Sequence, residues 1–63
     1  MSFFKIGDRV QTVQEEMDLE LVPAGTKVTL YRKNGRNLWY GTGEVGGIKR
    51  DLLLYENNLR AIS

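Results

Sequence analysis

One tyrosine and five cationic residues between positions 31 and 50 form a group that could bind nucleic acid. They are Tyr31, Arg32, Lys33, Arg36, Lys49 and Arg50. Cationic side chains bind phosphate groups and aromatic rings stack on bases, which is how small β domains hold single-stranded nucleic acid. Nucleic-acid binding is therefore one function that these residues allow. Most of the cations lie at expected hairpin tips or strand ends, where solvation alone favours charge, so a plain solvated surface is the competing interpretation.

A second charged segment precedes this one and is acidic. Its carboxylates belong to Glu15, Glu16, Asp18 and Glu20. The segment lacks the glycine and the twelve-residue ligand spacing of a calcium loop, so we expect a solvated loop or a partner for basic peptides. Two apolar residues within it, Met17 and Leu19, are expected to fold back onto the core while the carboxylates stay in water.

The composition offers little for catalysis or cofactor binding. The chain has neither cysteine nor histidine, which excludes a disulfide, a thiol nucleophile and ordinary zinc, haem or iron–sulfur ligation. Acid–base catalysis would then need a carboxylate held in a cleft, for which a domain of this size has little room. The segment 41–46, GTGEVG, satisfies G-x-G-x-x-G, but only 17 residues follow Gly46, too few for a dinucleotide-binding unit. We therefore expect no enzyme, no cofactor and no metal, and glycines that bend a strand.

The chain of 63 residues predicts a single small domain spanning residues 1–63. It has 41% hydrophobic residues and no apolar run long enough for a membrane span, as is typical of a globular protein. Its first residues, MSFFKIGD, do not resemble a secretory signal, so a cytoplasmic location is expected. The net charge is only +1, but it is unevenly spread. Residues 1–26 hold two cations and five carboxylates, whereas residues 27–50 hold six cations and one carboxylate.

The elements that must position these residues are strands. Alternating apolar residues predict strands at 9–14 and 27–32, and Asn34-Gly35 is typical of a tight hairpin turn that leads to a returning strand at 38–40. Residues 48–62 are ambiguous. They allow a strand, a turn at Asn57-Asn58 and a last strand, but apolar residues at helical spacing also allow a C-terminal helix.

Four further features follow one another in a recognisable order. They are the turn Glu20–Thr26, the pair Trp39–Tyr40, the glycine turn Gly46–Gly47 and the closing segment Leu54–Ile62. In this order the chain resembles a Src-homology-3 (SH3) domain from about Arg9 to Ile62. The opening phrase KIGDRV, residues 5–10, is similar to that of bacterial members of the wider SH3-like barrel superfamily. The resemblance implies an all-β fold, a single five-stranded SH3-like barrel; a small antiparallel sheet with a C-terminal helix is the alternative.

Such domains bind peptides between exposed rings and an acidic loop. Trp39 and Tyr40 are adjacent, so only one of them can face the core of a strand, and the resemblance implies that Trp39 is the exposed anchor. The other residues that it implies are Tyr40, Tyr55 and Asn57 as neighbours, and Glu15, Glu16 and Asp18 for a basic group of the ligand. Several rings of the family's proline-binding groove are replaced, the last tyrosine by Asn58, so the resemblance does not imply ordinary proline-rich recognition.

These observations lead to three hypotheses of function. The first is a non-enzymatic module that recognises a protein or peptide, with no membrane or small-molecule substrate as partner. The second is nucleic-acid binding through the basic residues. The third is a small structural subunit of a larger complex, which would leave an apolar patch on the isolated chain.

Overall fold

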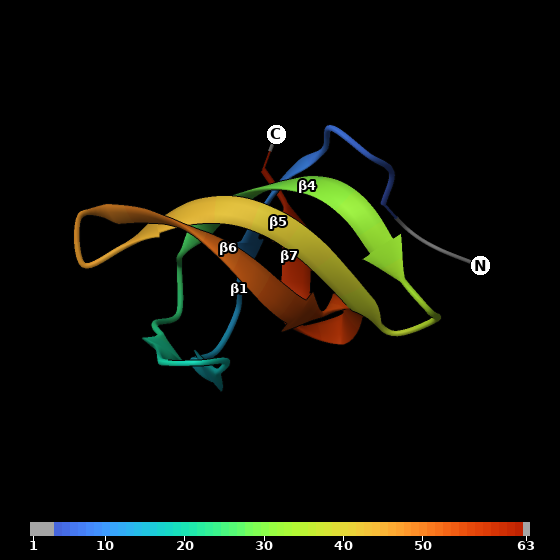
Figure 1. Cartoon of the computed structure of the whole chain (residues 1–63). Helices are drawn as coiled ribbons and strands as arrows, with labels where there is room; N and C mark the ends of the chain where they lie inside the picture. Colours follow the sequence, from blue (N-terminus) through green and yellow to red (C-terminus); the bar gives the residue numbers. More distant parts are fainter. Residues whose placement is uncertain (1–3, 63) are drawn as a thin grey trace.

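The structure is a computed structural model that describes residues 4–62; the ends of the predicted 1–63 domain, residues 1–3 and 63, lie outside the described residues. Strands make up most of the described chain, and one short 3-10 helix joins the last two (Figure 1). The elements are β1 (Arg9–Thr12), β2 (Glu16–Met17), β3 (Leu21–Val22), β4 (Lys27–Asn34), β5 (Leu38–Val45), β6 (Ile48–Tyr55), η1 (Glu56–Asn58) and β7 (Leu59–Ala61). No helix among residues 4–62 is long and apolar enough to cross a membrane.

Five of the strands form one antiparallel sheet in the order β6-β5-β4-β1-β7, and β2 pairs with β3 in a separate hairpin. The all-β prediction is confirmed. Strands β6 and β7 are the two edges and do not pair with each other, so the described residues form a curved, open sheet and not a hydrogen-bonded closed barrel (Figure 1). The alternative of a C-terminal helix is wrong, because residues 48–55 pair along the whole of β5 and only the three residues of η1 are helical.

The core lies where the apolar sides of the strands meet. Val28 and Leu30 are buried on β4 as the alternation predicted, and Leu52 and Leu54 are their counterparts on β6. Removing each such side chain from water contributes roughly 2 kcal/mol. The buried apolar residues are Val10, Val22, Val28, Leu30, Trp39, Leu52, Leu54 and Leu59. Those on the five-stranded sheet project from one side of it, and Val22 of β3 joins them from the β2–β3 hairpin.

Two glycines of β5 allow β4 to approach closely. A Cβ atom on Gly43 would lie 2.5 Å from the carbonyl oxygen of Lys27, and one on Gly41 would overlap with the side chain of Val28. No side chain fits at either place without moving the neighbouring strand. The glycines of the G-x-G-x-x-G pattern therefore lie within a strand and its turn, and no helix N-terminus follows them among the described residues.

A β-bulge interrupts the pairing of β4 with β5. Leu30 is paired with Gly41 and Arg32 with Tyr40, so Tyr31 is the extra residue. Adjacent residues of a regular strand point to opposite faces, but a bulge turns two successive side chains toward one partner. Tyr31 and Arg32 both lie against the ring of Tyr40 as a result.

The turn before β4 is held by two threonines. The hydroxyl groups of Thr12 and Thr26 both donate to the carbonyl oxygen of Pro23, at 2.8 and 2.7 Å, and the backbone N–H of Thr26 donates to the Thr12 hydroxyl. Both threonines are buried. The two hydroxyl groups thus bond to the backbone of the turn, at Pro23 and Thr26, and they fix the point at which Lys27 enters the sheet.

Candidate functional site

Trp39 lies in the core, and the expectation that it is an exposed ligand anchor is wrong. Its side chain is only 2% exposed. On β5 it shares the inward face with Gly41 and Gly43, so the adjacent Tyr40 takes the outward face. The Trp39 indole N–H donates to a carboxylate oxygen of Glu56 at 2.7 Å. A buried indole needs such a partner, since an unsatisfied donor in the core costs free energy.

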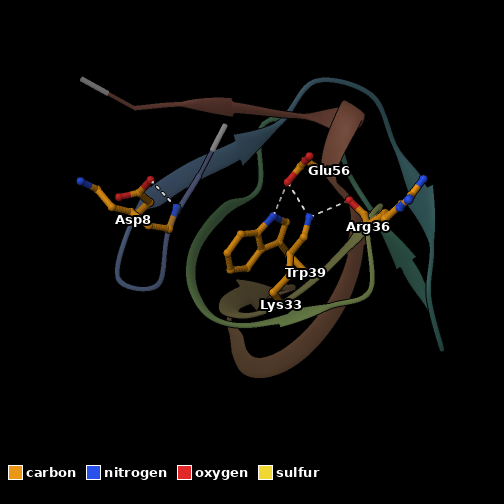
Figure 2. A network of polar contacts seen from close by, with 6 residues as sticks. Asp8, Lys33, Arg36, Trp39 and Glu56 are labelled. Atoms are coloured by element: carbon orange, nitrogen blue, oxygen red, sulfur yellow. Dashed lines mark hydrogen bonds and ion pairs between the residues drawn. The ribbon is translucent and has the colours of Figure 1, made fainter. Parts of the chain in front are cut away.

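The same carboxylate oxygen of Glu56 also binds a lysine. The Lys33 ammonium group lies 2.7 Å from it, lies 5.0 Å from the Trp39 ring centre, and donates to the carbonyl oxygen of Arg36 (Figure 2). Lys33 is thus occupied in holding the 34–37 turn to η1. Its assignment to a nucleic-acid surface is not supported by this geometry, because its three contacts use the positive charge within the fold.

Two carboxylates of the acidic loop, residues 15–20, point toward the sheet, whereas the sequence predicted that they point into solvent. The backbone N–H of Tyr55 donates to Glu16 at 2.9 Å, and that of Leu53 points to Asp18 at 3.4 Å. Both N–H groups lie on the free edge of β6, where the sheet offers them no partner. An exposed edge strand readily pairs with another chain, and these carboxylates cover it. The expectation that they remain solvated is therefore wrong for Glu16 and Asp18.

Glu20 continues this pattern two residues further along, where it forms an ion pair with Arg50. We call Glu16, Asp18 and Glu20 the edge cover. Because successive residues alternate in direction, the intervening apolar side chains point to solvent. Met17 is 70% exposed and Leu19 is 89% exposed, and Leu21, paired with Met17, is also exposed. The predicted packing of Met17 and Leu19 on the core is therefore wrong.

An open hollow of about 350 Å³ lies between the loop after β1 and the helix η1. Its one large ring is Tyr55, which is 55% exposed, and its second apolar side chain is Val13. Glu15 is exposed at its rim, and no hydrogen bond or ion pair within residues 4–62 engages its carboxylate. We call this site the acidic hollow. Its lining residues are Val13, Gln14, Glu15, Glu16, Tyr55, Asn57 and Asn58.

Asn58 holds the two walls of the acidic hollow together. Its side-chain oxygen accepts from the Gln14 N–H and its side-chain nitrogen donates to the Gln14 carbonyl, both at 2.9 Å. The same nitrogen also donates to Glu16 at 3.2 Å, and the Asn58 carbonyl accepts from the Val13 N–H at 2.9 Å. This amide therefore pairs with the loop as a strand would. The hollow is set by the fold before any ligand arrives.

A larger hollow of about 660 Å³ lies beside the turn into β4, at the opposite end of β6 from Tyr55. Three cations and one carboxylate line it, together with two threonines that are register partners, Thr29 and Thr42. No carboxylate within residues 4–62 forms an ion pair with any of the three cations. We call it the basic hollow. Its lining residues are Arg9, Ala24, Gly25, Thr26, Lys27, Thr29, Thr42, Gly43, Glu44 and Lys49.

The structure thus brings together only some of the residues predicted for each site. Of the residues predicted to bind a peptide, it brings together Glu15, Glu16, Tyr55 and Asn57 in the acidic hollow. It places Trp39 in the core, Tyr40 on the outward side of β5 and Asp18 against the edge of β6. Sequence reasoning missed the contribution of Val13 and Asn58. The two asparagines at 57–58 signalled a turn, but nothing local indicated that the second would bind a loop 44 residues earlier.

The predicted nucleic-acid residues are divided in the same way. Tyr31 and Arg32 meet at Tyr40, and Lys49 lines the basic hollow. Arg36 is exposed in the 34–38 turn, and Lys33 and Arg50 form ion pairs within the fold. Arg9 and Lys27, which complete the basic hollow, were not predicted. They could have been predicted, because the alternation of β1 and β4 places both of them on the outward side of the sheet.

Searches against protein-family models, curated proteins and solved structures give no match to this chain. Within residues 4–62, no group of three or more acidic side chains is placed to hold a metal ion.

Proposed function

We propose that this chain is a non-enzymatic binding module of SH3-like architecture that takes a short basic peptide in the acidic hollow. The observation that carries the proposal is that Tyr55, Val13 and Glu15 converge there from segments far apart in the sequence. A half-exposed ring, a second apolar side chain and an unpaired carboxylate match a peptide that offers one apolar and one cationic side chain.

The order of the matched segments supports the SH3-like part of the proposal. The turn Glu20–Thr26 leads directly into β4, the pair Trp39–Tyr40 lies on β5, and Gly46–Gly47 forms the turn between β5 and β6. The closing segment passes through η1 into the last strand, β7. The place of the family's ligand groove, between the acidic loop and this closing segment, is where the acidic hollow lies.

The rigidity of the site is a further argument for binding. Four hydrogen bonds that involve Asn58 hold the two walls in place without a ligand. A preformed site loses less conformational entropy when it binds, and this entropy is a main cost of association. Glu16 is fixed by its bonds to Tyr55 and Asn58, which leaves Glu15 as the carboxylate available to a partner.

A selection from a displayed library of random dodecapeptides tests the proposal. We expect enriched peptides to carry arginine or lysine next to an apolar residue, and their binding to shift the backbone NMR signals of residues 13–16 and 55–58. Tyr55→Ala should weaken binding about 30-fold, as for a central aromatic contact. Glu15→Gln should weaken it about threefold, as for an exposed charge pair.

Tyr31→Ala is the matched control, since Tyr31 is also an exposed tyrosine, at 43%, but stacks on Tyr40 and does not line the acidic hollow. It should leave peptide binding unchanged. A selection without enriched sequences, signals that shift only outside the acidic hollow, or a Tyr55→Ala variant that binds as the wild type does would each refute the proposal.

A further inference from the structure

We propose that the outward side of the five-stranded sheet binds single-stranded nucleic acid, with a phosphate group in the basic hollow and a base on the ring of Tyr31. This site shares no residue with the acidic hollow and does not rest on the peptide proposal. It goes beyond the predicted basic residues, because two of its three phosphate-binding cations, Arg9 and Lys27, were not among them.

The register of the strands shows that the two parts of the site are continuous. Tyr40, Thr42 and Glu44 alternate with the buried Trp39 and Gly41, so they share the outward side of β5. Thr42 is the register partner of Thr29, and Thr29 is that of Arg9. The basic hollow therefore begins on the same side of β5 as Tyr40, about 7 Å away along the strand.

The aromatic end presents a ring that is already supported from behind. The rings of Tyr31 and Tyr40 have centres 6.2 Å apart and planes inclined by 29°, and the Arg32 guanidinium carbon lies 4.6 Å from the Tyr40 ring centre. Tyr40 is half-buried, whereas Tyr31 is exposed. A base can stack on the free face of Tyr31 while Arg32 adds positive charge beside it. Every base has such a face, so this contact is tolerant of sequence.

The cationic end matches a phosphate group. Arg9, Lys27 and Lys49 approach the hollow from three different strands or their ends, and Glu44 is the one carboxylate in its lining. The hydroxyl groups of Thr29 and Thr42 add donors between these cations. Cations that no carboxylate neutralises within the fold release counterions from nucleic acid when they bind it, which favours association at low salt. An uncharged or basic partner would gain nothing from this arrangement.

Fluorescence anisotropy with a labelled, mixed-sequence single-stranded DNA oligonucleotide tests the inference. Three phosphate contacts predict that the affinity falls about 20-fold as NaCl rises from about 50 to about 200 mM. Lys27→Ala should weaken binding roughly fivefold at the lower salt concentration and reduce the salt dependence. Tyr31→Ala should weaken it about 10-fold through lost stacking. A duplex of the same sequence should bind less tightly, because its bases are not free to stack.

Two controls make the test specific. Arg36→Ala removes one exposed cation at the opposite end of the β4–β5 hairpin, and Tyr55→Ala removes the exposed ring of the acidic hollow. Both should bind the oligonucleotide as the wild type does. No binding at low salt, no salt dependence, or an Arg36→Ala variant as weak as Lys27→Ala would overturn the inference. Equal binding of duplex and single strand, or full binding by Tyr31→Ala, would overturn it and would indicate a cationic surface that binds any polyanion.

Discussion

Trp39 has an apolar body and one polar atom, and the fold uses both. The ring packs in the core among residues such as Leu54, its register partner on β6, and the indole N–H is bonded to Glu56. Lys33 in turn neutralises Glu56, which lies on η1. One side chain therefore connects β5, the 34–37 turn and the helix that leads into β7. This position explains why a tryptophan is placed here without any need for a ligand.

Replacing Trp39 should consequently affect folding before binding. Trp39→Ala is expected to cost about 3–5 kcal/mol, as for other large-to-small core changes. The whole domain is expected to have about 3–9 kcal/mol of stability, so this variant should be largely unfolded or strongly destabilised. Urea unfolding followed by circular dichroism measures the loss.

Tyr31→Ala again provides the comparison, because an exposed side chain should change the free energy of unfolding by less than about 1 kcal/mol. A Trp39→Ala variant with the urea midpoint of the wild type would show that the ring is not part of the core.

At the scale of elements, the β2–β3 hairpin acts on β6 through side chains and not through its own backbone. The edge cover presents a carboxylate at every second residue, and β6 offers outward N–H groups at the same period of two, at Leu53 and Tyr55. The strand beneath reads Leu52-Leu53-Leu54-Tyr55, four successive hydrophobic residues without a charge. Such a segment on an open edge is prone to pair with a second copy.

Removing the edge cover should therefore expose a surface for self-association. We expect the double variant Glu16→Ala/Asp18→Ala to form dimers or larger species in analytical ultracentrifugation as its concentration rises, while the wild type stays at a lower mass. The control Glu15→Ala/Glu44→Ala changes the net charge by the same amount but leaves the bonds to β6 intact. If both variants sediment alike, the carboxylates contribute charge and not protection of the edge.

At the scale of the whole molecule, a single core joins the five-stranded sheet and the β2–β3 hairpin. The core draws residues from β1, β3, β4, β5, β6 and β7, and no second cluster of buried residues is present within residues 4–62. Because Trp39 is the only tryptophan, its fluorescence reports on this core. We expect urea unfolding measured by fluorescence and by circular dichroism to give the same midpoint, as for a two-state domain. Separate midpoints would show that part of the sheet unfolds independently.

The sequence predicted those features that depend on neighbouring residues. The alternation of Val28 and Leu30 and the glycine of Asn34-Gly35 specify the β4–β5 hairpin locally. Gly35 adopts a positive φ of 69°, but Asn34 ends β4 and pairs with Leu38, so the turn is residues 35–37 and not the predicted pair Asn34-Gly35. Asn57-Asn58 favoured a turn over a helix for the same reason. These signals predicted the β4–β5 hairpin and the strand, turn and strand of residues 48–61, but not the strands β2 and β3.

What the sequence did not predict depends on contacts between distant segments. Alternation shows that Trp39 and Tyr40 face opposite sides but does not say which side is the core. Gly41 and Gly43, which share the side of Trp39 and leave room for β4, were the available signal. The direction of the acidic side chains could not be predicted, because they accept hydrogen bonds from the edge of β6, which lies 35 or more residues later. Closure of the five-stranded sheet into a barrel likewise requires β6 and β7 to pair, and these edge strands are distant along the sheet.

The pairing of the first strand with the last has a mechanical consequence. Val10 is the register partner of Ala61 and Thr12 that of Leu59, so β1 and β7 run antiparallel and the chain enters and leaves the sheet at the same end of this pair. A force applied between the segments before β1 and after β7 would load the hydrogen bonds of the pair one after another, as in opening a zipper. The domain should thus yield to small pulling forces despite its packed core, and it is better suited to recognising a partner than to carrying tension between two attached chains.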